Sequence, residues 1–329
     1  TIAEAMKAAG YRTAAFISNG YISRRWRFIQ GFDHVYNLIR ENKPNDARAV
    51  LARALPWIER NKDRPFYLYL GTSDTHVTYR AHPEFIKQYD PEPYAGPYRR
   101  YLAGKSLGRI KENRRKPSKR NRQRIEALYE NEAAYNDKHF GRLVAALKKH
   151  GLWDRTLLIV NSDHGEEFWE HGSCGHGHNL HQELISVPFV LRLPGVLPPT
   201  RITGGHDGVD LLPTLMELVG ATIPNEVQGE SLLPYVGRTY YPRAMVASDA
   251  GGSYALQAGP AKAILRSAAS MRVYDMNKDP AEHHDLSGSA PVLTQAALDP
   301  LALFIHLARE WHKRSWGVPN NLAPGFPHS

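Results

Sequence analysis

Strand-like apolar runs alternate with helix-like segments through most of this 329-residue chain. Residues 13–18, 66–71 and 156–161 are rich in β-branched, aromatic and other apolar side chains, which predicts strands. Segments with helical periodicity lie between these runs. This alternation is typical of a mostly parallel sheet flanked by helices, so we expect an α/β fold.

Local signals mark the helix ends. Thr1 and Glu4 have the spacing of a capping box, which predicts a helix that starts at residue 1 and stops near Gly10. A further buried-type strand is expected at residues 186–193. Further helices are expected at about residues 45–59, 123–150 and 208–219.

The pattern changes near residue 241. Short strands are expected from there on, followed by a helix at about residues 300–313. We therefore expect an α/β core over residues 1–240 and a small C-terminal α+β subdomain over residues 241–329, which ends in a Pro-rich tail at 318–329. The expected short strands are 243–248, 261–266 and 271–274.

Positive charge is concentrated in one stretch, residues 98–124, expected to be an insertion in the core. This stretch carries a net charge of +11, whereas the whole chain carries +9. The rest of the chain therefore has a net charge of −2. A nucleic-acid-binding body would spread its charge over a folded face, so we expect no nucleic-acid partner and a solvated loop here. Contact with an anionic polymer or a membrane surface stays open. The basic residues are Arg99, Arg100, Lys105, Arg109, Lys111, Arg114, Arg115, Lys116, Lys119, Arg120, Arg122 and Arg124.

The sequence predicts neither a membrane-spanning helix nor an internal disulfide. We find no run of 18 consecutive apolar residues, and the chain has a single cysteine, Cys174. The compartment stays open, with a periplasmic or extracellular location among the alternatives.

Candidate chemistry is concentrated after the strand at residues 156–161, which runs directly into Asp163-His164-Gly165. A carboxylate and an imidazole at the carboxyl end of a strand are suited to a metal site, and the glycine permits a tight turn. The alternative is that Asp163 caps a turn and His164 is a surface residue.

A Gly- and His-rich loop follows. We expect at least one of its histidines to face the site. Taken singly, His171, His178 and His181 are expected to be solvated loop residues.

These motifs resemble the C-terminal half of the sulfatase core, in the alkaline phosphatase superfamily. The match is collinear from residue 1 to about residue 290. It rests on Gly10-Tyr11-Arg12-Thr13-Ala14, Gly31-Phe32-Asp33, Tyr135-Asn136-Asp137, Asp163-His164-Gly165-Glu166, Gly175-His176-Gly177-His178-Asn179-Leu180, Asp210-Leu211-Leu212-Pro213-Thr214-Leu215 and Asp279-Pro280-Ala281-Glu282.

The resemblance implies an alkaline-phosphatase-like fold and the hydrolysis of small-molecule or carbohydrate sulfate esters. Asp163 and His164 match two ligands of one divalent cation, which is implied to be Ca²⁺, with Zn²⁺ or Mn²⁺ as alternatives. His76 matches a histidine that contacts the sulfate and leaving-group oxygens; the alternative is a strand-end residue with no substrate contact. His176 occupies the place of a lysine with a similar role, and an imidazolium can supply the same positive charge.

Two features that the resemblance implies are absent from the sequence: a strand with the first, acidic pair of metal ligands, and the nucleophile. The resemblance implies a nucleophile within C/S-x-P/A-x-R that is converted to formylglycine, whereas Cys174 has neither the proline nor the arginine. We expect on the order of 60 to 100 further residues before Thr1 to carry it, and this polypeptide alone to be inactive. Two alternatives stay open. One is a phosphodiester, phosphomonoester or phosphonate hydrolase of the same superfamily, and the other is a non-catalytic anion-binding remnant.

Overall fold

The computed structural model describes residues 1–24, 27–204, 206–225, 227–238, 240–241, 244–248, 252–266 and 270–316. The chain forms two compact units. Unit 1 comprises Thr1–Leu158, Arg192–Leu197 and Val209–Leu233, and unit 2 comprises Ile159–Leu191, Pro198–Gly208 and Pro234–Ser329. The predicted division at residue 240 stays a prediction, and the predicted Pro-rich tail lies outside the described residues.

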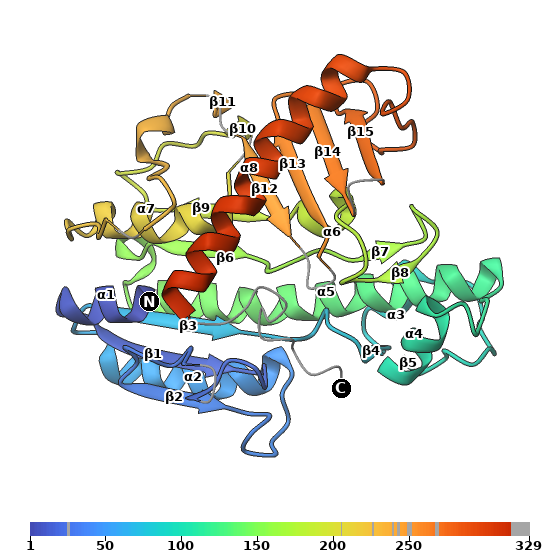
Figure 1. Cartoon of the computed structure of the whole chain (residues 1–329). Helices are drawn as coiled ribbons and strands as arrows, with labels where there is room; N and C mark the ends of the chain where they lie inside the picture. The colour runs from blue at the N-terminus through green and yellow to red at the C-terminus, as the bar shows by residue number, and fades with distance from the viewer. Residues whose placement is uncertain are drawn as a thin grey trace. The chain divides into compact units, whose positions relative to one another are not determined.

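Unit 1 is built on a parallel sheet in the order β2-β1-β3, with helices packed on it (Figure 1). The parallel sheet predicted from the sequence is confirmed for these strands. Short 3₁₀ turns lie at η2 (Trp153–Arg155), η3 (Gly208–Asp210) and η4 (Leu233–Tyr235). The strands and helices are α1 (Ile2–Ala8), β1 (Arg12–Ile17), β2 (His34–Asn37), α2 (Ala47–Asn61), β3 (Phe66–Gly71), β4 (Tyr79–Arg80), α3 (Ile86–Tyr89), β5 (Tyr101–Leu102), α4 (Gly104–Lys111), α5 (Lys119–Lys149) and α7 (Leu211–Leu218).

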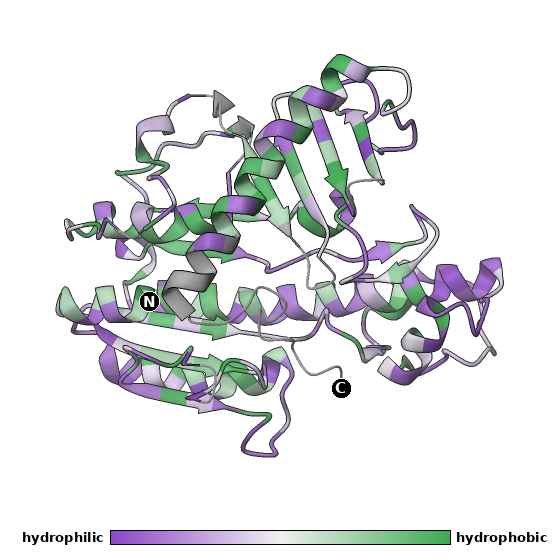
Figure 2. Ribbon diagram, in the orientation of Figure 1, coloured by the Kyte–Doolittle hydropathy of each residue, from purple (hydrophilic) through white to green (hydrophobic). Residues whose placement is uncertain are grey.

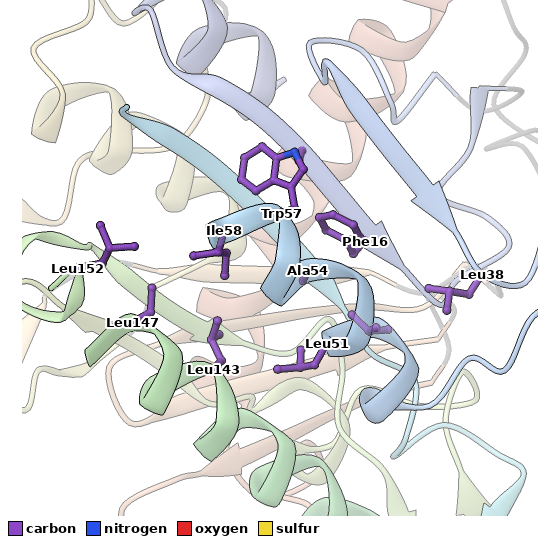
Figure 3. Close-up of a cluster of buried hydrophobic side chains, with 11 residues drawn as sticks. Phe16, Leu38, Leu51, Ala54, Trp57, Ile58, Leu143, Leu147 and Leu152 are labelled. Atoms are coloured by element: carbon purple, nitrogen blue, oxygen red, sulfur yellow. The ribbon is translucent and has the colours of Figure 1, made fainter. Parts of the chain in front are cut away.

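Side chains of β1, α2 and α5 form the core of unit 1 (Figure 3). Phe16 of β1 meets Trp57 of α2 edge to face, with ring centroids 6.4 Å apart. Leu143 and Leu147 of α5 complete the cluster from the other side of α2. Burying such side chains contributes about 1.5–3 kcal/mol each, so this cluster holds the two long helices on the sheet.

Capping groups fix several of these helices. The Thr1 hydroxyl accepts from the Glu4 N–H and the Glu4 side chain reaches back to the first residue, so the predicted capping box is confirmed. Asp46 caps α2 by accepting from Ala49 N–H at 2.8 Å. Ser118 caps α5 in the same way, which starts that helix at Lys119 rather than near residue 123, inside the basic stretch.

Unit 2 contains short strands, a four-stranded antiparallel sheet and a long helix. The sheet order is β12-β13-β14-β15, while β6 pairs with β9 and β7 with β8. The strands and helices are β6 (Leu158–Asn161), β7 (Glu167–Phe168), β8 (Cys174–Gly175), α6 (Gln182–Ile185), β9 (Phe189–Arg192), β10 (Thr203–Gly204), β11 (Tyr240–Tyr241), β12 (Met245–Ser248), β13 (Tyr254–Ala258), β14 (Ala261–Leu265), β15 (Met271–Asp275) and α8 (Pro291–Trp316).

The long helix α8 lies across this sheet (Figure 1). Ala297, Leu301 and Ile305, spaced by four residues, are buried against β13, β14 and β15. The predicted helix start at Pro300 was wrong, because the helix continues through this proline from Pro291. A proline inside a helix lacks the N–H of one backbone hydrogen bond, but α8 continues through Pro300.

Helix α8 also bears on the membrane prediction. Its window Pro291–Ala308 is long and apolar enough to cross a membrane by length and composition alone. It contains Asp299 and Pro300, and one face packs on the sheet of unit 2. A helix of a soluble protein can pass the same test, so the absence of a membrane span stays a prediction.

Candidate active site

The Asp163-His164-Gly165 turn follows β6 directly. Gly165 lies against α6, where its N–H donates to the Leu184 carbonyl at 2.8 Å. A Cβ atom on Gly165 would lie 2.1 Å from the Glu183 carbonyl oxygen, so no larger residue fits without movement of the backbone. The glycine that the sequence analysis expected to permit a tight turn is therefore needed because two backbones lie in close contact here.

Asp163 and His164 present two metal-binding atoms on the same side. The His164 Nδ1 lies 2.9 Å from the Gly165 carbonyl, and since a carbonyl only accepts, Nδ1 carries the proton and Nε2 has the lone pair. That Nε2 lies 3.9 Å from the Asp163 Oδ2, and the Asp163 side chain is 80% exposed. One cation can reach both atoms, so these two residues fit part of a metal shell; Ca²⁺ takes six to eight ligands, and others would complete it.

His176 lies beside His164. Their imidazole rings are tilted by 33° with centroids 4.0 Å apart. The His176 Nδ1 lies 3.1 Å from a carboxylate oxygen of Glu166, which is almost fully buried. The structure thus brings together one predicted metal ligand and one predicted catalytic residue, with Glu166 orienting the second imidazole.

Glu167 holds the loop that carries these histidines. Its buried carboxylate accepts from the His178 ring at 2.6 Å, the Asn179 amide at 2.8 Å and the Ser173 N–H at 2.6 Å. Burial alone would raise the pKa of Glu167, but the hydrogen bonds from His178 and the Ser173 N–H outweigh it and lower the pKa to about 2. Glu167 is therefore a fixed negative charge inside the loop.

A second histidine pair is formed by the two ends of this loop. The rings of His171 and His181 stack with centroids 3.5 Å apart and an interplanar angle of 6°. The His171 Nδ1 lies 2.7 Å from Glu183, and the His181 Nδ1 lies 3.0 Å from Glu282. Burial lowers the pKa of His171, but the Glu183 carboxylate outweighs this and the pKa is raised overall. Glu282 also contacts the buried ammonium of Lys262.

The prediction that His171, His178 and His181 are solvated was therefore wrong. Each pairs with a buried or half-buried carboxylate. The sequence could not show the pair of His181 with Glu282, because 101 residues separate them in the chain. The residues Glu166 and Glu167 were given no role either, although two carboxylates directly after Asp-His-Gly are a signal that something nearby must pair with them.

Within the described part of the chain, three side chains come close enough together to hold a further metal ion. The ligand atoms of His171, His181 and Glu282 lie within 4.8 Å of one another. Two nitrogens and one oxygen do not suit Ca²⁺, which prefers oxygen ligands. Since the Lys262 ammonium already contacts the same carboxylate, this group is better described as a buried ion-pair network.

His76 belongs to unit 1 and follows β3. It is exposed, and its Nδ1 lies 2.8 Å from the Val77 carbonyl. Two residues earlier, buried Asp74 accepts from the Ala47 N–H at 2.9 Å and so fastens the turn to the start of α2. Burial raises the pKa of Asp74 to about 6, although the Ala47 N–H acts in the opposite direction. His76 is therefore an exposed imidazole on an anchored turn.

Cys174 lies on β8 and is fully buried. Its strand pairs with β7, where Phe168 is opposite Cys174. A buried thiol on a strand is not placed for attack on a substrate, in agreement with the interpretation that Cys174 is not the nucleophile.

A sequence model of the sulfatase family matches residues 1–221. The chain belongs to the sulfatase family. Arylsulfatase K of Rattus norvegicus is 25% identical over 289 residues, covering 74% of this chain and 49% of that protein. Steryl-sulfatase of Rattus norvegicus is 27% identical over 211 residues, covering 58% of this chain and 30% of that protein. The chain spans half or less of the length of these sulfatase relatives.

Solved structures share the fold. A protein in complex with its substrate D-glucosamine-2-N,6-O-disulfate superposes with a TM-score of 0.70 and 19% identity, over 96% of this chain and 83% of that one. The phosphonate monoester hydrolase of Silicibacter pomeroyi superposes with a TM-score of 0.65 and 16% identity, over 98% of this chain and 81% of that one. The predicted family and its alkaline-phosphatase-like α/β fold are confirmed.

Proposed function

We propose that this chain carries part of the active site of an enzyme that hydrolyses sulfate esters. Asp163 and His164 bind one divalent cation, Ca²⁺, and His76 and His176 contact the sulfate and the leaving-group oxygen. The observation that carries the proposal is the contact between His164 and His176, whose ring centroids are 4.0 Å apart. A metal ligand and a catalytic imidazole must be neighbours if both are to act on one sulfate group.

The chain's own residues have distinct tasks in this proposal. The Glu166 carboxylate holds the His176 Nδ1, so that the protonated ring can direct its Nε2 proton toward the oxygen on which charge develops as the ester bond breaks. The Gly165 carbonyl holds the His164 Nδ1, which keeps Nε2 available as a ligand. A cation bound by Asp163 and His164 supplies Lewis-acid polarisation of a sulfate oxygen.

The nucleophile of this proposal lies outside the chain. A formylglycine formed within C/S-x-P/A-x-R would attack sulfur, and this polypeptide alone would not turn over. The buried position of Cys174 supports an external nucleophile.

A second candidate is a phosphonate or phosphate ester hydrolase of the same superfamily. The likeness to the Silicibacter pomeroyi phosphonate monoester hydrolase favours it. So does a relative from Trinickia caryophylli described as a multifunctional alkaline phosphatase superfamily protein, 26% identical over 226 residues. The same cation and imidazoles suit either ester, because both substrates place anionic oxygens at the metal.

The test is to read the gene in frame upstream of Thr1 and to assay its whole product. We expect C/S-x-P/A-x-R there, and faster hydrolysis of 4-nitrophenyl sulfate than of 4-nitrophenyl phosphate or phenylphosphonate. His176→Ala should lower kcat by about 10²–10³, as removal of a transition-state hydrogen-bond donor does. His34→Ala, an exposed histidine of β2, is the matched control. Preference for the phosphonate would favour the second candidate. A stop codon and then a start codon immediately upstream of Thr1, together with no turnover, would favour a non-catalytic anion-binding protein.

A further inference from the structure

The basic stretch at residues 98–124 is folded rather than a free loop. It contains β5, the whole of α4 and the first residues of α5. Figure 2 shows hydrophilic residues along the first turns of α5. The side chains exposed to solvent are Arg99, Arg100, Lys105, Arg109, Arg114, Lys116, Lys119 and Arg122.

Two arginines of the stretch are used to build the scaffold. Arg124 is buried and donates to Asp90 at 2.9 Å and to the Arg99 carbonyl at 2.6 Å. Arg120 donates to the other oxygen of Asp90 at 2.8 Å, and its guanidinium lies over the Tyr94 ring. These contacts fix the start of α5 to the segment before α4. The eight exposed cations are thus displayed on a fixed support.

Helix α4 is oriented by its apolar side. Leu107 and Ile110 are each 5% exposed, which turns Lys105 and Arg109 to solvent on the opposite side. These two cations are spaced i,i+4 on the same face, where like charges repel. Glu112, the single acid of the stretch, is paired with Arg114 at 2.9 Å. The surface therefore carries a large excess of positive charge that an anionic ligand would neutralise.

This surface begins beside His76. Strand β4 pairs with β5, where Tyr79 is opposite Leu102. A Cβ atom on Gly104, the first residue of α4, would be 3.9 Å from Val77 Cγ1. The carbonyl oxygen of Val77 in turn lies 2.8 Å from the His76 Nδ1. The first residue of α4 thus lies beside the turn that carries a proposed sulfate-contacting residue.

We propose that the exposed cations of α4 and the following turn bind a linear polysaccharide with several sulfate groups, of which one occupies the site at His76. The inference rests on the proposed function and names its substrate class. The bound polymer is neither cleaved nor modified by these cations. They contact sulfates on the neighbouring sugars, so they favour long substrates over monosaccharide esters. A nucleic acid is disfavoured because the rest of the chain has a net charge of −2 and because the surface adjoins the proposed ester site.

The test is direct binding of fluorescently labelled heparin to this chain, measured by anisotropy between 50 and 200 mM NaCl. The variant carries Lys105→Ser, Arg109→Ser, Lys116→Ser and Lys119→Ser. Counterion release makes the plot of log K against log salt fall with a negative slope. Removing four contacts should make this slope shallower by about 3 and weaken the affinity at least about tenfold at 50 mM NaCl. A control variant, Arg60→Ser with Arg64→Ser, removes exposed charges at the end of α2 and should bind as the wild type does.

Thermal unfolding of both variants checks that each is folded. Unchanged heparin binding in the quadruple variant would overturn the inference. Equal affinity for poly(U) would overturn it as well, since the surface would then recognise any polyanion. The assay needs no turnover, so failure of the whole gene product to hydrolyse sulfate esters would refute the proposed function while the binding result stood by itself.

Discussion

The His181 Nδ1 lies 3.0 Å from the Glu282 Oε2, although 101 residues separate them in the chain. The other oxygen of Glu282 contacts the ammonium of Lys262 on β14, and Glu282 also accepts from the Gln182 N–H at 2.8 Å. The side chains of His181, Glu282 and Lys262 are all buried. One carboxylate therefore joins the histidine-rich loop to the four-stranded sheet of unit 2.

Replacing Glu282 should destabilise the protein. In Glu282→Gln the Lys262 ammonium loses its counter-charge in a buried position, and breaking a buried pair in this way costs about 3–5 kcal/mol. Urea unfolding at pH 7 measures the free energy of unfolding. Glu92→Gln, at an exposed position, is the matched control and should change it by less than about 0.5 kcal/mol. Equal effects of the two changes would show that the buried pair contributes nothing.

Glu167 should make the protein acid-sensitive. Its folded-state pKa is about 2, below the ordinary value of 4.5, because hydrogen bonds from His178 and the Ser173 N–H outweigh burial. A depressed pKa stabilises the fold above pH 4.5, by about 3 kcal/mol here, and that stability is lost as the pH falls toward 2. We expect about 1 kcal/mol to be lost between pH 6 and pH 3.5. Urea unfolding of Glu167→Gln should lack this part of the pH dependence, and an unchanged dependence would contradict the assignment.

The features predicted correctly from sequence are local ones. The capping box at Thr1 and the strand that leads into Asp163 each depend on residues within one turn or one strand. The contacts of His171 and His181 with Glu282 could not be predicted in this way, because Glu282 follows β12–β15 in the chain, 101 residues after His181. Strand β13 was missed for a related reason: its two buried residues, Ala255 and Leu256, are adjacent and give no alternation, and the strand is defined by pairing on both sides.

The turn at Gly165 should not tolerate a side chain. In Gly165→Ala the new Cβ would meet the Glu183 carbonyl oxygen at 2.1 Å, so the turn or α6 must move. Overpacking of this kind costs about 1–3 kcal/mol, which thermal unfolding should detect. Gly141→Ala is the matched control within α5, where nothing lies within 4 Å, and it should stabilise the protein by up to about 1 kcal/mol. A neutral Gly165→Ala would mean that the close approach to Glu183 is not kept in solution.

Asp163 should contribute to metal affinity. Asp163→Asn removes the charge of a hard oxygen ligand, and we expect Ca²⁺ binding to the whole gene product, measured by calorimetry, to weaken about 10- to 100-fold. Asp154→Asn is the control, because its carboxylate is also 80% exposed. If both variants bind Ca²⁺ as the wild type does, Asp163 is not a ligand.

Asp74 should behave in the opposite sense to Glu167. Burial raises its pKa to about 6, although the Ala47 N–H partly opposes this, and its Oδ2 has no hydrogen-bond partner among the described residues. A raised carboxyl pKa means that the ionised form weakens the fold above pH 6, by about 2–3 kcal/mol, and that this cost disappears as the pH falls through 6 toward 4. Asp74→Asn keeps an oxygen for the Ala47 N–H without the charge. Its melting temperature should therefore exceed that of the wild type at pH 8, and the difference should narrow as the pH falls toward 4, whereas a lower melting temperature at pH 8 would show that the charge of Asp74 is needed by a neighbour.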